Sequence, residues 1–188
     1  MLICIDLLSL YLDLSTLFRS LPDPRRRQGL RYPLEAMLWM SFLSIASGYT
    51  SYRQIGNFCA IRKEFFMEYF GIKAVPSYVS FRTIFTLLNN KIFLEKFKEQ
   101  YLMTVQSGDF IASDGQTLCS TVENSQNISQ DFCSIVSFYC QQSGLTVAME
   151  SYLNSKEHEG EVFPNLLDNL RNKGVIFTLD ALHTQKKQ

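Results

Sequence analysis

Hydrophobic residues recur with a helical spacing over the first hundred residues of the chain. The pattern predicts helices over residues 13–20, 33–48, 51–59, 65–70, 77–88 and 92–105. Pro33 suits the first position of its helix, and Gly48 and Gly71 suit the position just after a helix end. Thr50 or Ser51 is a good N-cap for the third of these helices, and Ser77 is a good N-cap for the fifth. These signals predict an all-helical N-terminal domain over residues 1–106.

The spacing of apolar residues becomes strand-like after Ser107. Strands are expected over residues 110–114, 132–139, 145–152 and 175–179, with a polar loop over residues 119–130. Apolar residues at helical spacing predict one helix over residues 162–170, which makes a crossover into the last strand. The whole chain is therefore expected to be α+β, with a mixed-sheet domain over residues 107–188.

Two of the expected strands stop on an aspartate, Asp114 in the first and Asp180 in the last. A buried strand that ends in a carboxylate places that charge at the edge of a rigid sheet. If the crossover makes the two strands neighbours, both carboxylates face one point, and a divalent cation relieves their repulsion. The alternative is that each aspartate only forms a turn or caps a helix.

Four arginines, Arg25, Arg26, Arg27 and Arg31, lie within seven positions between two prolines. Prolines and Gly29 make this stretch a loop rather than a helix face. Guanidinium groups pair with two phosphate oxygens at once, so the loop suits a nucleic-acid backbone. A solvated loop whose arginines pair with nearby acids explains the pattern equally well.

The net charge of zero conceals an asymmetry along the chain. Residues 1–106 carry 13 Lys/Arg against 8 Asp/Glu, and residues 107–188 carry 5 against 10. A basic first part suits phosphate and an acidic second part suits a metal cation, although ordinary charge scatter also gives such numbers. The five cysteines show no metal-site spacing, and no apolar run is long enough to span a bilayer. We expect a reduced, cytoplasmic protein without membrane contact.

Several stretches together resemble one family of proteins. The stretches Asp23-Pro-Arg-Arg-Arg-Gln-Gly-Leu-Arg-Tyr-Pro33, Ser51-Tyr-Arg-Gln-Ile55 and Pro76-Ser77 with Phe81 resemble the N-terminal domain of the ISAs1-type transposases, also called H-repeat-associated proteins. The stretch Ile111-Ala-Ser-Asp-Gly-Gln-Thr-Leu118 is similar to the first-aspartate motif of their DDE domain, and the stretch Phe177-Thr-Leu-Asp-Ala-Leu-His-Thr-Gln-Lys-Lys187 to the second. The resemblance covers the chain from about Leu17 onward.

The resemblance implies a ribonuclease-H-like catalytic domain that cleaves and transfers DNA strands with two Mg²⁺ ions. It makes Asp114 and Asp180 the metal ligands and transposon ends the DNA partner. His183 and Lys186, just after Asp180, are candidate phosphate contacts; the alternative for both is an exposed first helical turn, which is the preferred explanation for Lys186. Two metal ions held by carboxylates activate one oxygen and stabilise the other without a protein nucleophile, and the chain shows no nucleophile–histidine arrangement.

Two departures from the family pattern change the expected activity. Gln116 and Cys119 stand where the family usually has lysine and arginine, which removes positive charge beside Asp114. The third acid of the family, a glutamate on a later helix, has no counterpart. The chain is thus interpreted as a C-terminally truncated transposase, inactive alone. The alternatives are a non-catalytic DNA-binding remnant that occupies transposon ends, or an unrelated metal nuclease. The oligomeric state is left open, a homo-oligomer included.

Overall fold

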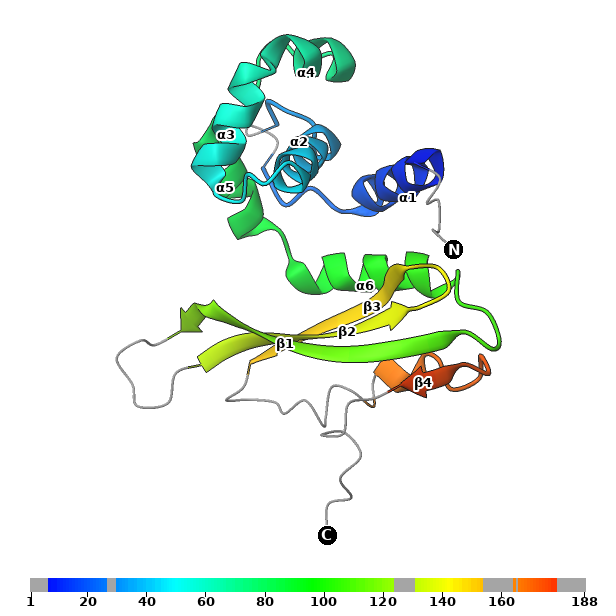
Figure 1. Ribbon diagram of the computed structural model, residues 1–188. Helices are drawn as coiled ribbons and strands as arrows, with labels where there is room; N and C mark the ends of the chain where they lie inside the picture. Colours follow the sequence, from blue (N-terminus) through cyan, green and yellow to red (C-terminus); the bar gives the residue numbers. More distant parts are fainter. Residues whose placement is uncertain (1–6, 27–29, 124–130, 154–163, 165, 179–188) are drawn as a thin grey trace. The chain divides into compact units, whose positions relative to one another are not determined.

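The computed structural model describes residues 7–26, 30–123, 131–153, 164 and 166–178 (Figure 1). It is a mixed α+β structure that divides into two compact units, one of residues 6–93 and the other from residue 94 onward. Helix α6 (Asn90–Leu102) begins in the first unit and enters the second at Leu94. The domain boundary expected at residues 106/107 separates two parts that would each fold independently. A division by contacts within one structure does not test independent folding, so this boundary stays a prediction.

Helix α2 (Leu34–Ala46) lies at the centre of the first unit, packed against α1 (Leu7–Ser20). The Trp39 ring meets Phe18 of α1 edge-on, with 5.2 Å between ring centroids. Most of α2 is buried, as expected for a helix with apolar residues on more than one side. Helix α1 begins six residues earlier than the 13–20 helix predicted, because the polar residues Ser9 and Asp13 do not interrupt the helical spacing of the leucines.

Helix α3 (Tyr52–Ile61) begins with a capping box formed by Ser51 and Gln54. The Ser51 hydroxyl accepts a hydrogen bond from the Gln54 amide at 3.3 Å, and the Gln54 side chain accepts one from the Ser51 amide at 3.0 Å. Two backbone donors at the helix start are thereby satisfied. Of the two predicted N-cap candidates, Thr50 and Ser51, the structure has Ser51, and the Ser-Tyr-Arg-Gln stretch has a structural cause.

Replacing Ser51 with alanine is expected to lower the free energy of unfolding by about 1 kcal/mol, because one cap acceptor is lost. Chemical denaturation followed by helical circular dichroism measures this. The control is Ser47→Ala, because the Ser47 hydroxyl follows the end of α2 and donates to the Leu43 carbonyl, outside any N-cap. An equal loss in both variants would contradict the capping role.

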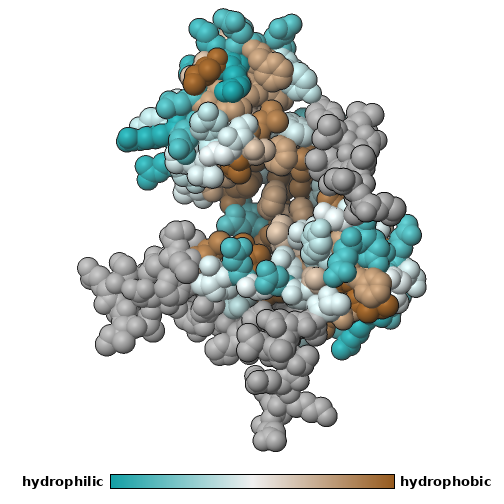
Figure 2. Space-filling view, in the orientation of Figure 1, coloured by the Kyte–Doolittle hydropathy of each residue, from teal (hydrophilic) through white to brown (hydrophobic). Residues whose placement is uncertain are grey.

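Helices α4 (Lys63–Phe70) and α5 (Tyr78–Leu87) complete the first unit. Gly71 ends α4 with a φ of 62°, the left-handed conformation that its position as a C-cap requires. Helix α5 packs against α3 at Gly56, where an added Cβ would meet the Tyr78 backbone nitrogen at 3.0 Å. The two backbones approach so closely only because Gly56 has no side chain. Figure 2 shows apolar residues on one face of this unit in small groups among hydrophilic ones.

The second unit contains a mixed sheet in the order β3-β2-β1-β4. Its strands are β1 (Phe110–Glu123), β2 (Asp131–Cys140), β3 (Leu145–Leu153) and β4 (Ile176–Thr178). The first three form an antiparallel meander, and β4 runs parallel to β1. Figure 1 shows β4 beside the long β1, although residues 124–175 separate these two strands in sequence.

Strand β1 is longer than the sequence pattern indicated. The prediction ended it at Asp114 and made residues 119–130 a loop, but the strand continues to Glu123, which pairs with Asp131 of β2. That part of the prediction is wrong for residues 119–123, and residues 124–130 lie outside the described part. The β-branched Thr121 and Val122 favour a strand here, and pairing with β2 outweighs the polarity of their neighbours.

One face of the sheet is buried and the other is more exposed. Ile111 and Ser113 of β1 pair with Cys140 and Phe138 of β2, and all four are buried. Directly opposite residues share a face, so these positions form the core side. Asp114 alternates with them and therefore lies on the exposed side.

Candidate nucleic-acid and metal sites

The arginine loop is fixed to the first unit by Arg25. Its guanidinium forms a bidentate pair with Asp23, with Nε–Oδ1 at 2.9 Å and Nη2–Oδ2 at 2.6 Å. Nη2 also donates to the Tyr32 carbonyl at 2.7 Å. The Arg25 side chain is 9% exposed. The guanidinium beside Asp23 holds the pKa of that carboxyl below its ordinary value of 3.8, the largest cause being their hydrogen bond. At Arg25, therefore, the arginine does pair with a nearby acid.

Arg26 and Arg31 differ from Arg25 because both are exposed. Within the described part of the chain neither forms an ion pair. Arg27 lies outside the described residues. The loop thus divides into one arginine that holds it in place and two that face solvent. Their predicted role as DNA contacts stays a prediction.

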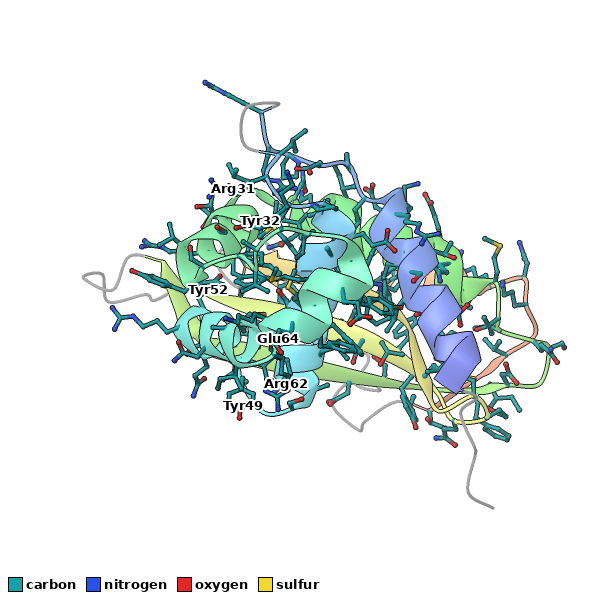
Figure 3. All side chains as sticks on the ribbon, turned by 90° about the horizontal axis from the view of Figure 1, so that it is seen from above. Arg31, Tyr32, Tyr49, Tyr52, Arg62 and Glu64 are labelled. Carbon is teal, nitrogen blue, oxygen red and sulfur yellow. The ribbon has the colours of Figure 1, made fainter. Side chains whose placement is uncertain are left out.

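Two pockets meet at Arg31 and Tyr32, which line both. The larger has a volume of about 760 Å³ and the smaller about 330 Å³. Figure 3 shows these two side chains next to each other, apart from Tyr49, Arg62 and Glu64 on another part of the unit. The Tyr32 hydroxyl donates to the Val75 carbonyl at 3.3 Å and so ties the loop to the segment before α5. Lys73 lines the larger pocket with Arg31, although no sequence motif pointed to it as a phosphate contact.

Asp114 lies on the exposed face of β1, opposite Ser137 of β2. The Ser137 hydroxyl donates to the Asp114 backbone carbonyl at 3.4 Å, which leaves the carboxylate uninvolved. Asp114 forms no ion pair with any described residue. A solvent-facing carboxylate on a rigid central strand is a suitable oxygen ligand for a hard cation such as Mg²⁺. Gln116, two positions further on, is exposed on the same face.

The other predicted members of the metal site, Asp180, His183 and Lys186, lie outside the described residues. Strand β4 ends two residues before Asp180, and its last described pair is Ala112 with Thr178. Among the described residues no three His, Cys, Asp or Glu side chains gather at one place. Of the predicted metal site, the described part contains only Asp114 and the parallel strand beside it, so the metal site stays a prediction.

A cysteine nucleophile is not indicated among the described residues. Burial raises the pKa of the Cys59 thiol to about 11, so it is protonated at neutral pH. Cys140 is also buried, with its sulfur 3.6 Å from an Asp109 oxygen. Both are buried and behave as packing residues. No helix of the described part is long and apolar enough to cross a bilayer.

Comparisons with known proteins point to transposases. Residues 15–100, somewhat under half of the chain, match the model of the DDE_Tnp_1-associated family. A protein of Escherichia coli strain K12 titled "Putative transposase YncI" is 26% identical over 172 residues, which cover 88% of this chain and 66% of that protein. "Putative protein YbfL" of the same strain is 24% identical over 169 residues, 88% of this chain and 44% of its own length.

These matches support a relation of the chain to DDE transposases. The chain spans about two thirds of the first relative and less than half of the second. The family model covers the unit that carries the arginine loop.

Proposed function

We propose that these 188 residues supply the DNA-contacting part and two of the metal ligands of a DDE transposase of the ISAs1 type, and that they are inactive alone. In this proposal the first unit contacts DNA at the ends of the element through Arg26, Arg27 and Arg31, positioned by Arg25. The second unit is a ribonuclease-H-like domain whose Asp114 and Asp180 hold Mg²⁺. The observation that carries the proposal is the register between β1 and β4.

The two strands run parallel with a constant offset of 66 residues. Phe110 pairs with Ile176, Ile111 with Phe177 and Ala112 with Thr178. If the same register continues for two more residues, position 114 is level with position 180. In a parallel pair, residues that are level share a face of the sheet. Both aspartates would then lie on the exposed face that Asp114 occupies, which supports a shared cation site.

The chemistry of such a site explains why no protein nucleophile is needed. When bound, paired Mg²⁺ ions activate a water or a DNA 3′-hydroxyl and stabilise the leaving oxygen. The role of this chain is to hold the ions with Asp114 and Asp180 and to fix the DNA backbone. His183 and Lys186 are the proposed phosphate contacts on the side of Asp180.

A strand-cleavage assay on DNA that carries the ends of the element tests the enzymatic part. With two of the three carboxylates of such a site, these 188 residues alone are expected to give no cleavage with Mg²⁺ or Mn²⁺. Metal binding remains measurable without cleavage: Mn²⁺ titration followed by water-proton relaxation should detect binding that Asp114→Asn abolishes. Glu150→Gln is the control, because it removes a half-buried carboxylate from the other face of the same sheet, opposite Val136. Robust cleavage would contradict the expected inactivity, and unchanged Mn²⁺ binding in Asp114→Asn would contradict the site.

A second candidate function is DNA binding without chemistry. The observation that favours it is that the exposed Arg26 and Arg31 lie in the unit that the family model matches. It predicts salt-dependent DNA binding that survives Asp114→Asn. Arg26→Ala and Arg31→Ala should each lower the slope of log K against log salt by about one, as the loss of one phosphate contact does. Fluorescence anisotropy over a range of salt concentrations measures this, and slopes that do not change would exclude the loop as the DNA contact.

A further inference from the structure

The smaller of the two pockets at Arg31 combines features that suit an anion. It has a volume of about 330 Å³ and lies in the first unit between the arginine loop, α2 and the beginning of α5. Its polar lining consists of two arginines, one tyrosine and three hydroxyl residues: Arg25, Arg31, Tyr32, Ser77, Ser80 and Thr83. Among the described residues, no aspartate or glutamate lines it. The lining therefore offers hydrogen-bond donors and the positive charge of Arg31, which pairs with no described acid, whereas the charge of Arg25 is already paired with Asp23, which lines the adjoining pocket.

One nitrogen of the Arg25 guanidinium, Nη1, is available to a ligand in this pocket. Its Nε and Nη2 are occupied by Asp23 and the Tyr32 carbonyl, as described above. Its Nη1 contacts the sulfur of Met37 at 3.3 Å, and Met37 also lines the pocket. A thioether is a weak acceptor for a guanidinium donor. An oxygen anion in the pocket would be a much better partner for Nη1, and Asp23 and Tyr32 hold the side chain in the orientation that receives it.

The hydroxyls of α5 are available in the same way. Ser77 occupies the N-cap position of α5 with extended backbone angles, yet its side chain makes no capping hydrogen bond, unlike Ser51 of α3. Ser80 and Thr83 follow at intervals of three residues, which places all three hydroxyls along one side of the helix. Thr86 instead donates to the Arg82 carbonyl at 2.9 Å. Within the described part of the chain, no such bond uses the hydroxyls of Ser80 and Thr83.

We infer that this pocket binds one phosphate group of the DNA backbone. The inference rests on the proposed DNA contact of the arginine loop and refines it. Arg25 and Arg31 supply guanidinium donors from one wall, and Ser77, Ser80 and Thr83 supply hydroxyl donors from the other. A phosphate has several oxygens that accept from different directions at once, which matches donors on two walls. Arg26 does not line the pocket and contacts a different phosphate.

The test uses hydroxyl variants that keep the shape and charge of the pocket. The double variant Ser80→Ala/Thr83→Val is compared with Arg31→Gln. Arg26→Ala is the control for the titration with inorganic phosphate, because Arg26 does not line the pocket. Binding of a 20-base-pair duplex is followed by anisotropy at several salt concentrations. Titration with inorganic phosphate is followed by amide NMR shifts of residues 77–83 in the full chain. Thermal unfolding confirms that every variant is folded.

The hydroxyl variant is expected to weaken DNA binding about three- to tenfold without changing the salt slope, because neutral hydrogen bonds are lost. Arg31→Gln should weaken binding and lower the slope by about one. Inorganic phosphate should shift the amides of residues 77–83 in the wild type and in Arg26→Ala, and much less in the hydroxyl variant and in Arg31→Gln.

The outcomes separate this inference from the proposed function. If the hydroxyl variant binds DNA as tightly as the wild type while Arg26→Ala binds weakly, the pocket inference is overturned and the DNA contact of the loop stands. If the wild type binds inorganic phosphate but no DNA, both are overturned. Loss of DNA affinity in the hydroxyl variant together with loss of the phosphate-induced shifts supports both.

Discussion

Replacing Arg25 with alanine is expected to lower the free energy of unfolding of the first unit by about 2–3 kcal/mol. Arg25 is nine-tenths buried and holds both the Asp23 carboxylate and the Tyr32 carbonyl. Removing one partner of a buried ion pair leaves the other charge without a partner. This lowers the free energy of unfolding by about 3–5 kcal/mol when both groups are fully buried. The Asp23 side chain is 28% exposed, so water recovers part of this loss. Chemical denaturation at pH 7 measures the difference.

The control for Arg25→Ala is Arg26→Ala, the same change at the exposed neighbour. It should alter stability by less than about 0.5 kcal/mol, as surface substitutions usually do. The two variants thereby separate the structural role of Arg25 from the DNA contact proposed for Arg26. A loss of DNA binding in Arg25→Ala has to be compared with its loss of stability, whereas a loss in Arg26→Ala reports contact directly. Equal stability losses in the two variants would contradict the structural role of Arg25.

The Arg25 effect also has a defined pH dependence. The pKa of Asp23 is lowered in the folded protein, so its pairing stabilises the fold at all pH values above the unfolded value of 3.8. That contribution is lost as the pH falls through the lowered folded value. The stability difference between wild type and Arg25→Ala should therefore be constant from pH 5 to 7 and shrink toward pH 2. A difference that grows on acidification would contradict the pairing with Asp23.

Replacing Gly56 with valine is expected to destabilise the first unit by about 2–3 kcal/mol. A Cβ at this position would lie 3.0 Å from the Tyr78 backbone nitrogen and 3.2 Å from its Cβ, which is tighter than most packed Cβ contacts. The clash is with the backbone at the beginning of α5, so α3 and α5 must separate, and overpacking of this kind typically costs about 1–3 kcal/mol. Gly56→Ala should cost less, because alanine's helix propensity offsets about 1 kcal/mol.

Ala60→Val is the matched control for Gly56→Val. Ala60 lies on the same helix but is exposed, so valine there changes only helix propensity, by well under 1 kcal/mol. Urea denaturation of the three variants and the wild type compares them directly. If Gly56→Val and Ala60→Val lose the same stability, the close contact between α3 and α5 does not constrain the fold.

Local signals predicted much of the helical unit. Pro33, Ser51 and Gly71 lie at helix ends as predicted, because their effects depend on the backbone of a few neighbouring residues. Ser77 shows where such reasoning stops. Its N-cap position was correctly predicted, but its hydroxyl makes no capping bond. The sequence gives no indication of the pocket that the hydroxyl faces, since the loop of residues 25–33 and α5 meet only through tertiary contacts such as Tyr32 with Val75.

The positions of the strands were predicted better than the length of β1. Apolar alternation located all four strands, but β1 continues nine residues beyond Asp114 because β2 pairs with it. The sequence predicted aspartates at two strand ends, and the structure places Asp114 within a strand rather than at its end. The adjacency of β1 and β4 was a condition of the metal-site hypothesis, and it is observed. The pairing of β1 with β4 cannot be predicted from a local sequence pattern, because the paired residues are 66 positions apart.

The parallel pairing of β1 with β4 bears on the order in which the protein folds. The β1-β2-β3 meander joins neighbours in sequence, whereas β4 must return across the intervening segment to reach β1. Contacts between distant residues carry the larger loop-closure cost and slow folding. We therefore expect β4 to dock last, so that the proposed cation site between β1 and β4 would form only at the final stage of folding. Cation affinity would then report on completed folding more sensitively than sheet content does.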